Sequence, residues 1–381
     1  MRRDFDAAVA GGGPAGAAAA LALARAGRRV LLIEKSPEGP PRAGEALPPA
    51  ARPLLRDLGL LDRLAAEGHL PCYGNLSVWG SDEPHTADFL FNPYGHGWHL
   101  DRRRFDAMLR DAARDAGAEL RVGRLIDAER STGGPWLIRT DRRPGGVPGL
   151  SCDWLVDTTG RRSAIACRRG AVRRRDDALV ALLARFCPPA GPGRDRDSRT
   201  LIEATPSGWW YTTLLPSGER VVAFLTDADL VDNSSRTSEG FRDRLYDARH
   251  LHALLAGHGY QIVGRPRGAD AGSSRLDRFA GDGWVAAGDA AIAFDPLSSQ
   301  GLLGALDTGT NAGRAIDRAL AGDIGPMVDF CRRVGEIYAA YRRELAVYYA
   351  AERRWADRPF WSRRLPIEQP IPHDHARPYT P

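Results

Sequence analysis

The chain has 381 residues, of which 43% are hydrophobic and 27% are charged, and its formal net charge is +5 at pH 7. This length allows one large or two closely packed domains, and no uncharged run is long enough to predict a membrane helix. Five scattered cysteines without a Cys-x-x-Cys pair predict neither a disulfide framework nor a metal site, so we expect a cytoplasmic protein without metal.

The positive charge comes almost entirely from arginine, because Lys35 is the only lysine. The short basic run Arg173–Arg175 is not interleaved with aromatic residues. A basic stripe with stacking aromatics is typical of nucleic-acid binding, so we expect no nucleic-acid partner.

The first predicted elements form a strand–turn–helix–strand unit. Asp4–Ala10 predicts a buried strand, Ala15–Ala26 a helix of strong helix formers, and Arg29–Ile33 a second parallel strand. The turn after the first strand reads G-x-G-x-x-G and contains Gly11, Gly13, Pro14, Ala15 and Gly16. Such a turn lets a pyrophosphate approach the backbone at the N-terminus of the helix. The unit therefore predicts a dinucleotide site.

Glu34 directly follows the second strand, with Lys35 beside it. A carboxylate at this position can accept hydrogen bonds from the ribose hydroxyls of the adenosine half. We therefore predict that both residues contact the cofactor.

Further along the chain, Arg103–Ala116 predicts an amphipathic helix. The runs Trp209–Leu215 and Arg220–Thr226 predict a β-hairpin. Pro326–Arg354 predicts a long helix, and the proline-rich tail from Pro366 is expected to be irregular.

A second nucleotide-like segment lies in the C-terminal half. The predicted strand Gly283–Ala287 is followed by Gly288 and Asp289, and the run Phe294–Gly301 then leads into a small-residue helix. This pattern resembles the Gly-Asp segment of FAD-dependent monooxygenases with a Rossmann-like domain of the glutathione-reductase type. The resemblance implies that FAD is the cofactor.

The same resemblance assigns roles along this segment. It implies that Asp289, next to Gly288, binds the ribitol and that Pro296 lies beside the isoalloxazine. It also implies that the amides near Gly301 and Leu302 stabilise negative charge on the flavin ring.

The resemblance also implies the fold class and its organisation. We expect an α/β (overall α+β) fold, with a Rossmann-like FAD domain, a β-sheet substrate domain and a C-terminal helical segment. The expected FAD domain is discontinuous and comprises residues 1–70, 99–165 and 272–325. The expected substrate domain comprises residues 71–98 and 166–271, and the C-terminal helix and tail comprise residues 326–381.

Other segments resemble the halogenase-like branch of this superfamily. By that likeness Glu45 and Ala46 lie near the isoalloxazine, and Arg42 in the same segment contacts the cofactor. Arg102 matches a position that faces the flavin in relatives. Aromatic hydroxylases carry an Asp-Gly pair where this chain reads Asp-Thr-Thr-Gly at 157–160. Because of this difference, the sequence does not decide between two sources of electrons: NAD(P)H used directly, or FADH2 from a partner flavin reductase.

The candidate catalytic residues are titratable or aromatic and lie in segments expected near the flavin. They are His96, His99, Tyr211 and Asp295. In relatives, FAD reacts with O2 to form a C4a-hydroperoxide that attacks an electron-rich ring. Packing roles for the two histidines and for Tyr211 stay open at this point.

Four activities remain as alternatives. The runs Leu47–Ala51, Tyr94–Arg102 and Asp295–Gly301 resemble flavoproteins that hydroxylate a peptidyl tryptophan during quinone-cofactor maturation. The resemblance implies an aromatic substrate, possibly a tryptophan in a peptide or protein subunit. Hydroxylation of a free or carrier-bound aromatic, halogenation, and a flavin oxidase or reductase activity are the other three. Tryptophan halogenases use a catalytic lysine, and Lys35, beside the ribose acid, is ill placed for that role.

Overall fold

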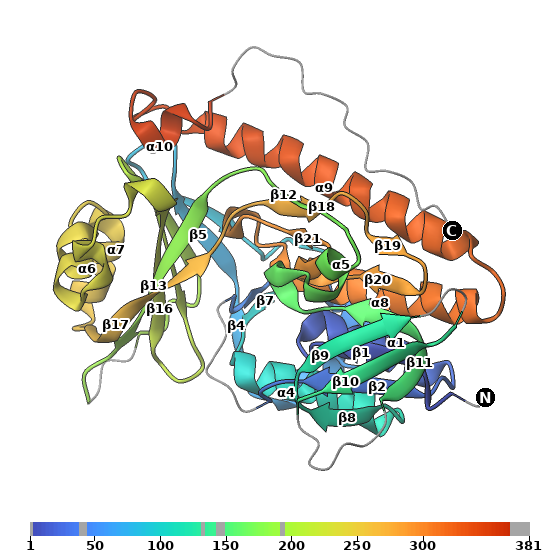
Figure 1. Cartoon of the computed structure of the whole chain (residues 1–381). Helices are drawn as coiled ribbons and strands as arrows, with labels where there is room; N and C mark the ends of the chain where they lie inside the picture. The colour runs from blue at the N-terminus through green and yellow to red at the C-terminus, as the bar shows by residue number, and fades with distance from the viewer. Residues whose placement is uncertain (1–2, 38–43, 131–133, 142–148, 191–194, 366–381) are drawn as a thin grey trace.

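The structure is a computed structural model that describes residues 3–37, 44–130, 134–141, 149–190 and 195–365. Figure 1 shows two parts of the molecule: a mostly parallel sheet packed with helices, and a second sheet beside it. One long helix runs along both parts. The expected α/β class is confirmed. The predicted irregular tail from Pro366 lies outside the described residues.

The first sheet has eight strands in the order β19-β20-β11-β1-β2-β8, and β10 and β9 extend it from β11. Their bounds are β1 (Phe5–Ala10), β2 (Val30–Glu34), β8 (Glu119–Val122), β9 (Leu125–Arg130), β10 (Trp136–Thr140), β11 (Leu150–Asp157), β19 (Ala280–Gly281) and β20 (Trp284–Ala286). Strands β2, β1, β11 and β20 are parallel. The central strands are mostly apolar and buried, as expected for parallel strands covered on both faces.

Helix α1 (Pro14–Arg25) packs between α8 (Gly301–Leu320) and α4 (Arg102–Asp115). Helix α8 crosses α1 at very short range, because a Cβ at Gly309 would overlap the carbonyl of Ala15. Small residues on both helices therefore bring α8 close to the turn that precedes α1.

The second sheet has seven strands in the order β17-β13-β16-β15-β14-β5-β6. Their bounds are β5 (Gly74–Val78), β6 (His85–Asp88), β13 (Leu179–Cys187), β14 (Thr200–Thr205), β15 (Gly208–Leu214), β16 (Arg220–Asp227) and β17 (Gln261–Asp270). The predicted hairpin is confirmed as the antiparallel pair β15–β16. Helices α6 (Ser238–Leu245) and α7 (Arg249–Gly257) cover one face of this sheet over Trp210 and Phe224.

Shorter elements connect the two sheets. One three-stranded sheet contains β3 (Ala46–Leu47), β7 (Gly97–His99) and β4 (Leu70–Cys72), and another contains β12 (Arg173–Arg175), β18 (Ser274–Leu276) and β21 (Ile292–Ala293). The short helices are α2 (Ala51–Asp57), α3 (Leu61–Ala66) and α5 (Ala164–Arg168), and the 3-10 turns are η1 (Gly160–Arg162), η2 (Ala228–Leu230), η3 (Ser234–Arg236), η4 (Gly288–Ala290) and η5 (Pro296–Ser298).

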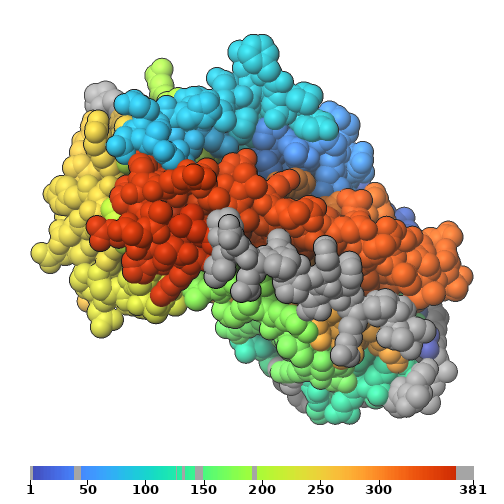
Figure 2. Space-filling model, turned by 90° about the horizontal axis from the view of Figure 1, so that it is seen from above, coloured from blue at the N-terminus to red at the C-terminus, as the bar shows by residue number. Residues whose placement is uncertain are grey.

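The long helix α9 (Gly325–Ala351) and the short helix α10 (Pro359–Ser362) end the described chain. Figure 2 shows them crossing one face of the molecule towards α6 and α7, which are drawn in yellow. The predicted helix over Pro326–Arg354 is confirmed, although it stops earlier. Glu352 is extended and fully buried, and its carboxylate accepts the Gly80 amide at 2.8 Å.

Candidate functional site

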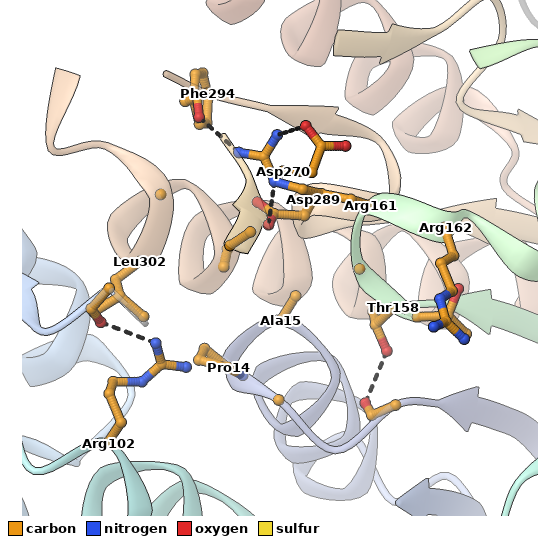
Figure 3. A pocket seen from close by; sticks show the side chains of 18 of the residues that line it. Pro14, Ala15, Arg102, Thr158, Arg161, Arg162, Asp270, Asp289, Phe294 and Leu302 are labelled. Atoms are coloured by element: carbon orange, nitrogen blue, oxygen red, sulfur yellow. Dashed lines mark hydrogen bonds and ion pairs between the residues drawn. The ribbon is translucent and has the colours of Figure 1, made fainter. Parts of the chain in front are cut away.

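A cavity of about 710 Å³ lies between the first sheet and the second sheet. Its lining comes from several parts of the chain: the turn before α1, the end of β2, residues 44–46, the start of α4, residues 123–125, residues 158–168, the second sheet with Ala271, and residues 287–305. Figure 3 shows the middle of this cavity, with α1 on one side and the segment around Asp289 on the other. The volume and the mixed lining are typical of a small-molecule or cofactor site.

The glycine turn forms one end of the cavity. Gly11 has a φ of +112°, and a Cβ there would overlap the carbonyl of Thr158. A Cβ at Gly16 would overlap the carbonyl of Gly11. Helix α1 then begins at Pro14, and no side chain caps its N-terminus. The turn thus presents bare backbone and a positive helix end to the cavity, which favours a bound anion.

Thr158 completes this turn, although it lies outside the glycine motif. Its hydroxyl is 2.9 Å from the carbonyl oxygens of both Ala10 and Gly11. Figure 3 shows it pointing to the turn. It follows β11, which lies beside β1. Ligands of parallel sheets bind at the carboxyl ends of the strands, and this rule is the signal that could have identified Thr158 from sequence.

Glu34 and Lys35 line the same end of the cavity. The Glu34 carboxylate accepts the amide of Gly12 at 2.7 Å and that of Ser36 at 3.0 Å. A Cβ at Gly12 would lie 2.8 Å from the Glu34 Cβ, so glycine is needed there. Glu34 therefore also shapes the turn, a role that the sequence did not indicate, while the Lys35 side chain is exposed at the rim.

Asp157 is fully buried and caps α5 instead of facing the cavity. Its two carboxylate oxygens accept the Thr159 amide and hydroxyl and the amides of Ile165 and Ala166 at 2.7–3.0 Å. The Asp-Thr-Thr-Gly run thus fixes the turn η1, and from this turn Arg161 and Arg162 line the cavity.

The segment around Asp289 faces the middle of the cavity. Figure 3 shows the guanidinium of Arg161 between Asp270 and Asp289, at 3.6 and 3.7 Å from their carboxylates. Arg161 also donates to the Phe294 carbonyl at 2.9 Å. Gly288 has a φ of +61°, and a Cβ there would lie 2.7 Å from that of Ala15. Gly288 thus lets this segment lie directly against α1.

Asp295 is only 1% exposed to solvent, yet it lines the cavity. One carboxylate oxygen accepts the Leu297 amide at 2.9 Å and so caps the turn η5. Burial raises the pKa of Asp295 to about 6. Pro296 follows, and Gly301 and Leu302 at the start of α8 complete this wall.

Arg102, Glu45 and Ala46 also line the cavity, and the strand β3 that contains Ala46 contacts α8. Arg102 makes a buried ion pair with Asp106 at 3.1 Å. It also donates to the Gly44 carbonyl at 2.9 Å (Figure 3). Burial raises the pKa of Glu45, against the effect of the Arg102 charge. The predicted contact residue Arg42 lies outside the described residues.

The second sheet covers the far end of the cavity with small and apolar side chains. Strand register places Ala223 between Tyr211 and Leu183, and Leu225 next to Ala181. All five line the cavity, and we call them the roof. Burial and the nearby Glu45 carboxylate raise the pKa of Tyr211, so its hydroxyl stays protonated and can donate. The roof therefore suits a flat, apolar ring with one hydrogen-bonding group.

The two candidate histidines lie outside this lining, within the part of the chain that the structure describes. His96 packs against the rings of Tyr73 and Trp98. His99 is fully buried, with its Nε2 3.0 Å from the Thr200 hydroxyl. Burial lowers the pKa of His99 to about 4, so it is neutral at pH 7. The structure therefore brings Tyr211 and Asp295 to the cavity but not the histidines.

Several lining residues were missed by sequence reasoning. They include Thr158, Arg161, Arg162, Arg124, Arg168 and the four aliphatic residues of the roof. Within the described ranges no cluster of histidine, cysteine, aspartate and glutamate could hold a metal ion. No helix in those ranges has both the length and the apolar character of a membrane span.

Comparisons with known proteins agree with this geometry. A family model described as an FAD binding domain matches residues 4–327. An FAD-dependent oxidoreductase, LodB of Marinomonas mediterranea, is 30% identical over 369 residues, which is 94% of this chain and 96% of LodB.

Among the similar solved structures are a halogenase and a dihydroxylase. The myxobacterial chondrochloren halogenase CndH has a TM-score of 0.86 and 26% identity, with 96% of this chain and 87% of CndH covered. The peptidyl tryptophan dihydroxylase QhpG, essential for tryptophylquinone cofactor biogenesis, has a TM-score of 0.76 and 25% identity, with 96% and 80% covered.

Proposed function

The chain belongs to the FAD binding domain family and is an FAD-dependent enzyme, and on this premise we propose that it hydroxylates an electron-rich aromatic ring with O2. We propose further that the ring is a tryptophan side chain in a peptide or protein. The observation that carries the proposal is a single cavity with an anion-binding glycine turn at one end and an apolar roof with Asp295 at the other.

The residues of the cavity fit FAD. The uncapped N-terminus of α1 and the crowded glycines leave space and donors for a pyrophosphate, as the family requires. The residues that would hold the adenosine and pyrophosphate are Gly11, Gly13, Pro14, Ala15, Gly16, Glu34, Lys35 and Thr158. Those that would hold the ribitol and the isoalloxazine are Arg102, Glu45, Ala46, Gly288, Asp289, Pro296, Gly301 and Leu302.

Reduced FAD supplies the electrons with which O2 is activated in such enzymes. We propose NAD(P)H or FADH2 from a partner reductase as the source of these electrons. One oxygen atom enters the ring and the other leaves as water, so each turnover consumes one O2, two electrons and two protons.

The chain's own residues orient the ring and move protons. The roof positions the ring of the substrate and excludes water. The Tyr211 hydroxyl donates a hydrogen bond to the substrate. Asp295 accepts the proton that the ring carbon loses when the new C–O bond has formed, and the C–H electron pair returns to the ring. A carboxyl with a pKa of about 6 is mostly ionised at pH 7 and is therefore ready for this role.

Likeness to QhpG supports a peptidyl tryptophan over a free small aromatic, since the two chains align over most of their length. Likeness to CndH favours halogenation as the second candidate. The position of Lys35, directly after Glu34 at the rim by the glycine turn, speaks against a lysine-dependent halogenation at the roof.

The test is incubation of the FAD-loaded protein with reductant, ¹⁸O2, bromide and a tryptophan-bearing peptide. We expect the peptide to gain one labelled oxygen atom for each hydroxylation. A brominated peptide would instead support halogenation, and an unlabelled, dehydrogenated peptide would support an oxidase; either result would overturn the proposal.

A further inference from the structure

Two hydrogen bonds join three distant parts of the chain at one wall of the cavity. The Trp209 indole on β15 lies 3.1 Å from the Tyr349 hydroxyl on α9. That hydroxyl lies 2.7 Å from a carboxylate oxygen of Asp295, just before η5. The Tyr349 hydroxyl therefore links the second sheet, through Trp209, to the Asp295 carboxylate in the cavity wall.

The direction of these bonds follows from their chemistry. The indole nitrogen of Trp209 can only donate, so the Tyr349 oxygen accepts from it. The hydroxyl proton of Tyr349 is then directed to Asp295. Because the Leu297 amide donates to the other carboxylate oxygen, both oxygens of Asp295 accept hydrogen bonds. This arrangement stabilises the ionised carboxylate.

The ring of Tyr349 is held firmly in this position. It is 3% exposed, and the rings of Trp79 and Trp361 lie 5.9 and 6.1 Å from it. Tyr341, two turns earlier on α9, accepts the backbone amide of Asp295 at 2.7 Å. Helix α9 therefore fixes both the backbone and the side chain of Asp295.

We propose that Tyr349 and Trp209 are positioning residues that hold Asp295 as an acceptor-only carboxylate at the cavity wall. The long helix is then part of the active site. The inference rests on the proposed function, in which Asp295 takes the proton from the ring carbon. The Tyr349 hydroxyl binds one carboxylate oxygen of Asp295 and the Leu297 amide binds the other. The incoming proton therefore has to bind a remaining lone pair of one of these oxygens.

The surroundings of Asp295 predict what the loss of this hydrogen bond does. Burial and the charge of Asp177 raise the pKa of Asp295, whereas the hydrogen bonds from Leu297 and Tyr349 and the charge of Arg364 lower it. Removal of the Tyr349 hydroxyl therefore raises the pKa of Asp295 further. A lost hydrogen bond to a carboxylate corresponds to an upward shift of about one pH unit.

The experiment compares Tyr349→Phe with Tyr348→Phe, the same chemical change at the neighbouring residue, which is 63% exposed. Infrared difference spectra of the FAD-loaded protein, recorded without substrate over a pH series, report protonation of buried carboxyl groups. Asp295→Asn identifies the signal that belongs to Asp295. We expect its midpoint to rise by about one pH unit in Tyr349→Phe and to stay unchanged in Tyr348→Phe.

Trp209→Phe serves as a second variant if Tyr349→Phe does not fold, because it removes the N–H that orients the hydroxyl. It too is expected to raise the midpoint. An unchanged midpoint in a folded, FAD-loaded variant would overturn the positioning role. Because the spectra need no turnover, a shifted midpoint in a protein that hydroxylates nothing would uphold this inference and reject only the proposed function.

Discussion

The hydroxyl of Thr158 lies 2.9 Å from the carbonyl oxygen of Gly11, and the two residues are 147 positions apart in the chain. The same hydroxyl contacts the Ala10 carbonyl at an equal distance. The end of β11 is thus tied to the turn that follows β1. The conformation of the glycine motif therefore depends on a residue that the motif does not include.

Thr158→Val should weaken FAD binding, because valine keeps the shape of the side chain but cannot hydrogen-bond to the turn. The loss of about 1 kcal/mol corresponds to a roughly fivefold higher Kd. Fluorescence titration of the apoprotein with FAD measures this change. Thr140→Val, at the end of β10, is the matched control and should leave the Kd unaltered. Equal affinities for both variants would contradict a role of Thr158 in the turn.

Gly16→Ala should abolish FAD binding. The added Cβ would overlap the Gly11 carbonyl and lie 2.6 Å from the Thr158 hydroxyl, so the turn would have to move. The check is the flavin absorbance that remains after gel filtration of the reconstituted protein. Gly257→Ala is the control, since nothing lies within 4 Å of its added Cβ. Retention of stoichiometric FAD in Gly16→Ala would show that the turn tolerates the methyl group.

Asp295→Asn should lower kcat by about 100-fold or more, because a general base contributes that much to proton transfer. The wild-type pH profile of kcat should fall below pH 6, where Asp295 takes up a proton. The variant should lack this acidic limb while its Kd for FAD stays similar. A full acidic limb in Asp295→Asn would assign the titration to another group.

The stability of the protein should fall with acid because of His99. Burial lowers the pKa of this histidine to about 4, below its usual value of 6.5. Between these values the unfolded chain binds a proton that the folded protein does not, so stability is lost as the pH falls. The full difference amounts to about 3 kcal/mol.

Urea unfolding at pH 7 and pH 5 measures this effect. His99→Asn should flatten the dependence relative to the wild type, and the exposed His85→Asn should not. Other titrating groups are common to all three proteins and cancel in the comparison. Parallel pH dependences for His99→Asn and the wild type would contradict the assignment.

Lys35→Ala should leave hydroxylation within about threefold of the wild-type rate, because Lys35 lies at the glycine-turn end of the cavity. It should raise the Kd for FAD modestly, since one exposed charge contributes up to about 1 kcal/mol. The assay is product formation at saturating FAD. Complete loss of turnover with FAD still bound would show that Lys35 acts in the chemistry.

Much of the scaffold could be predicted because its signals are local. The glycine turn, the helix that begins beside Arg102 and the hairpin through Trp209 each follow from spacing and composition within a short window. Their partners were much harder to predict. The contact of Asp295 with Tyr349 spans 54 residues, and no local pattern marks which tyrosine of a helix faces a carboxylate.

The same limit applies to the histidines. His96 and His99 lie in a segment with many aromatic residues, and such a pattern cannot tell an active-site histidine from one packed against a strand. Only the strand pairing of β7 turns His99 towards Thr200. Asp157 is a related case, because its hydrogen bonds to Ile165 and Ala166 depend on a turn that the sequence alone does not reveal.

The C-terminal helix has a consequence for the order in which the enzyme becomes active during synthesis. The ribosome makes the glycine turn early, Thr158 much later, and Tyr349 after nearly all the other elements of the described chain. The residues proposed to hold the cofactor end at Leu302, so all of them are synthesised before α9. A nascent chain that stops short of Tyr349 would therefore carry the complete set of cofactor residues but lack the hydroxyl that orients Asp295.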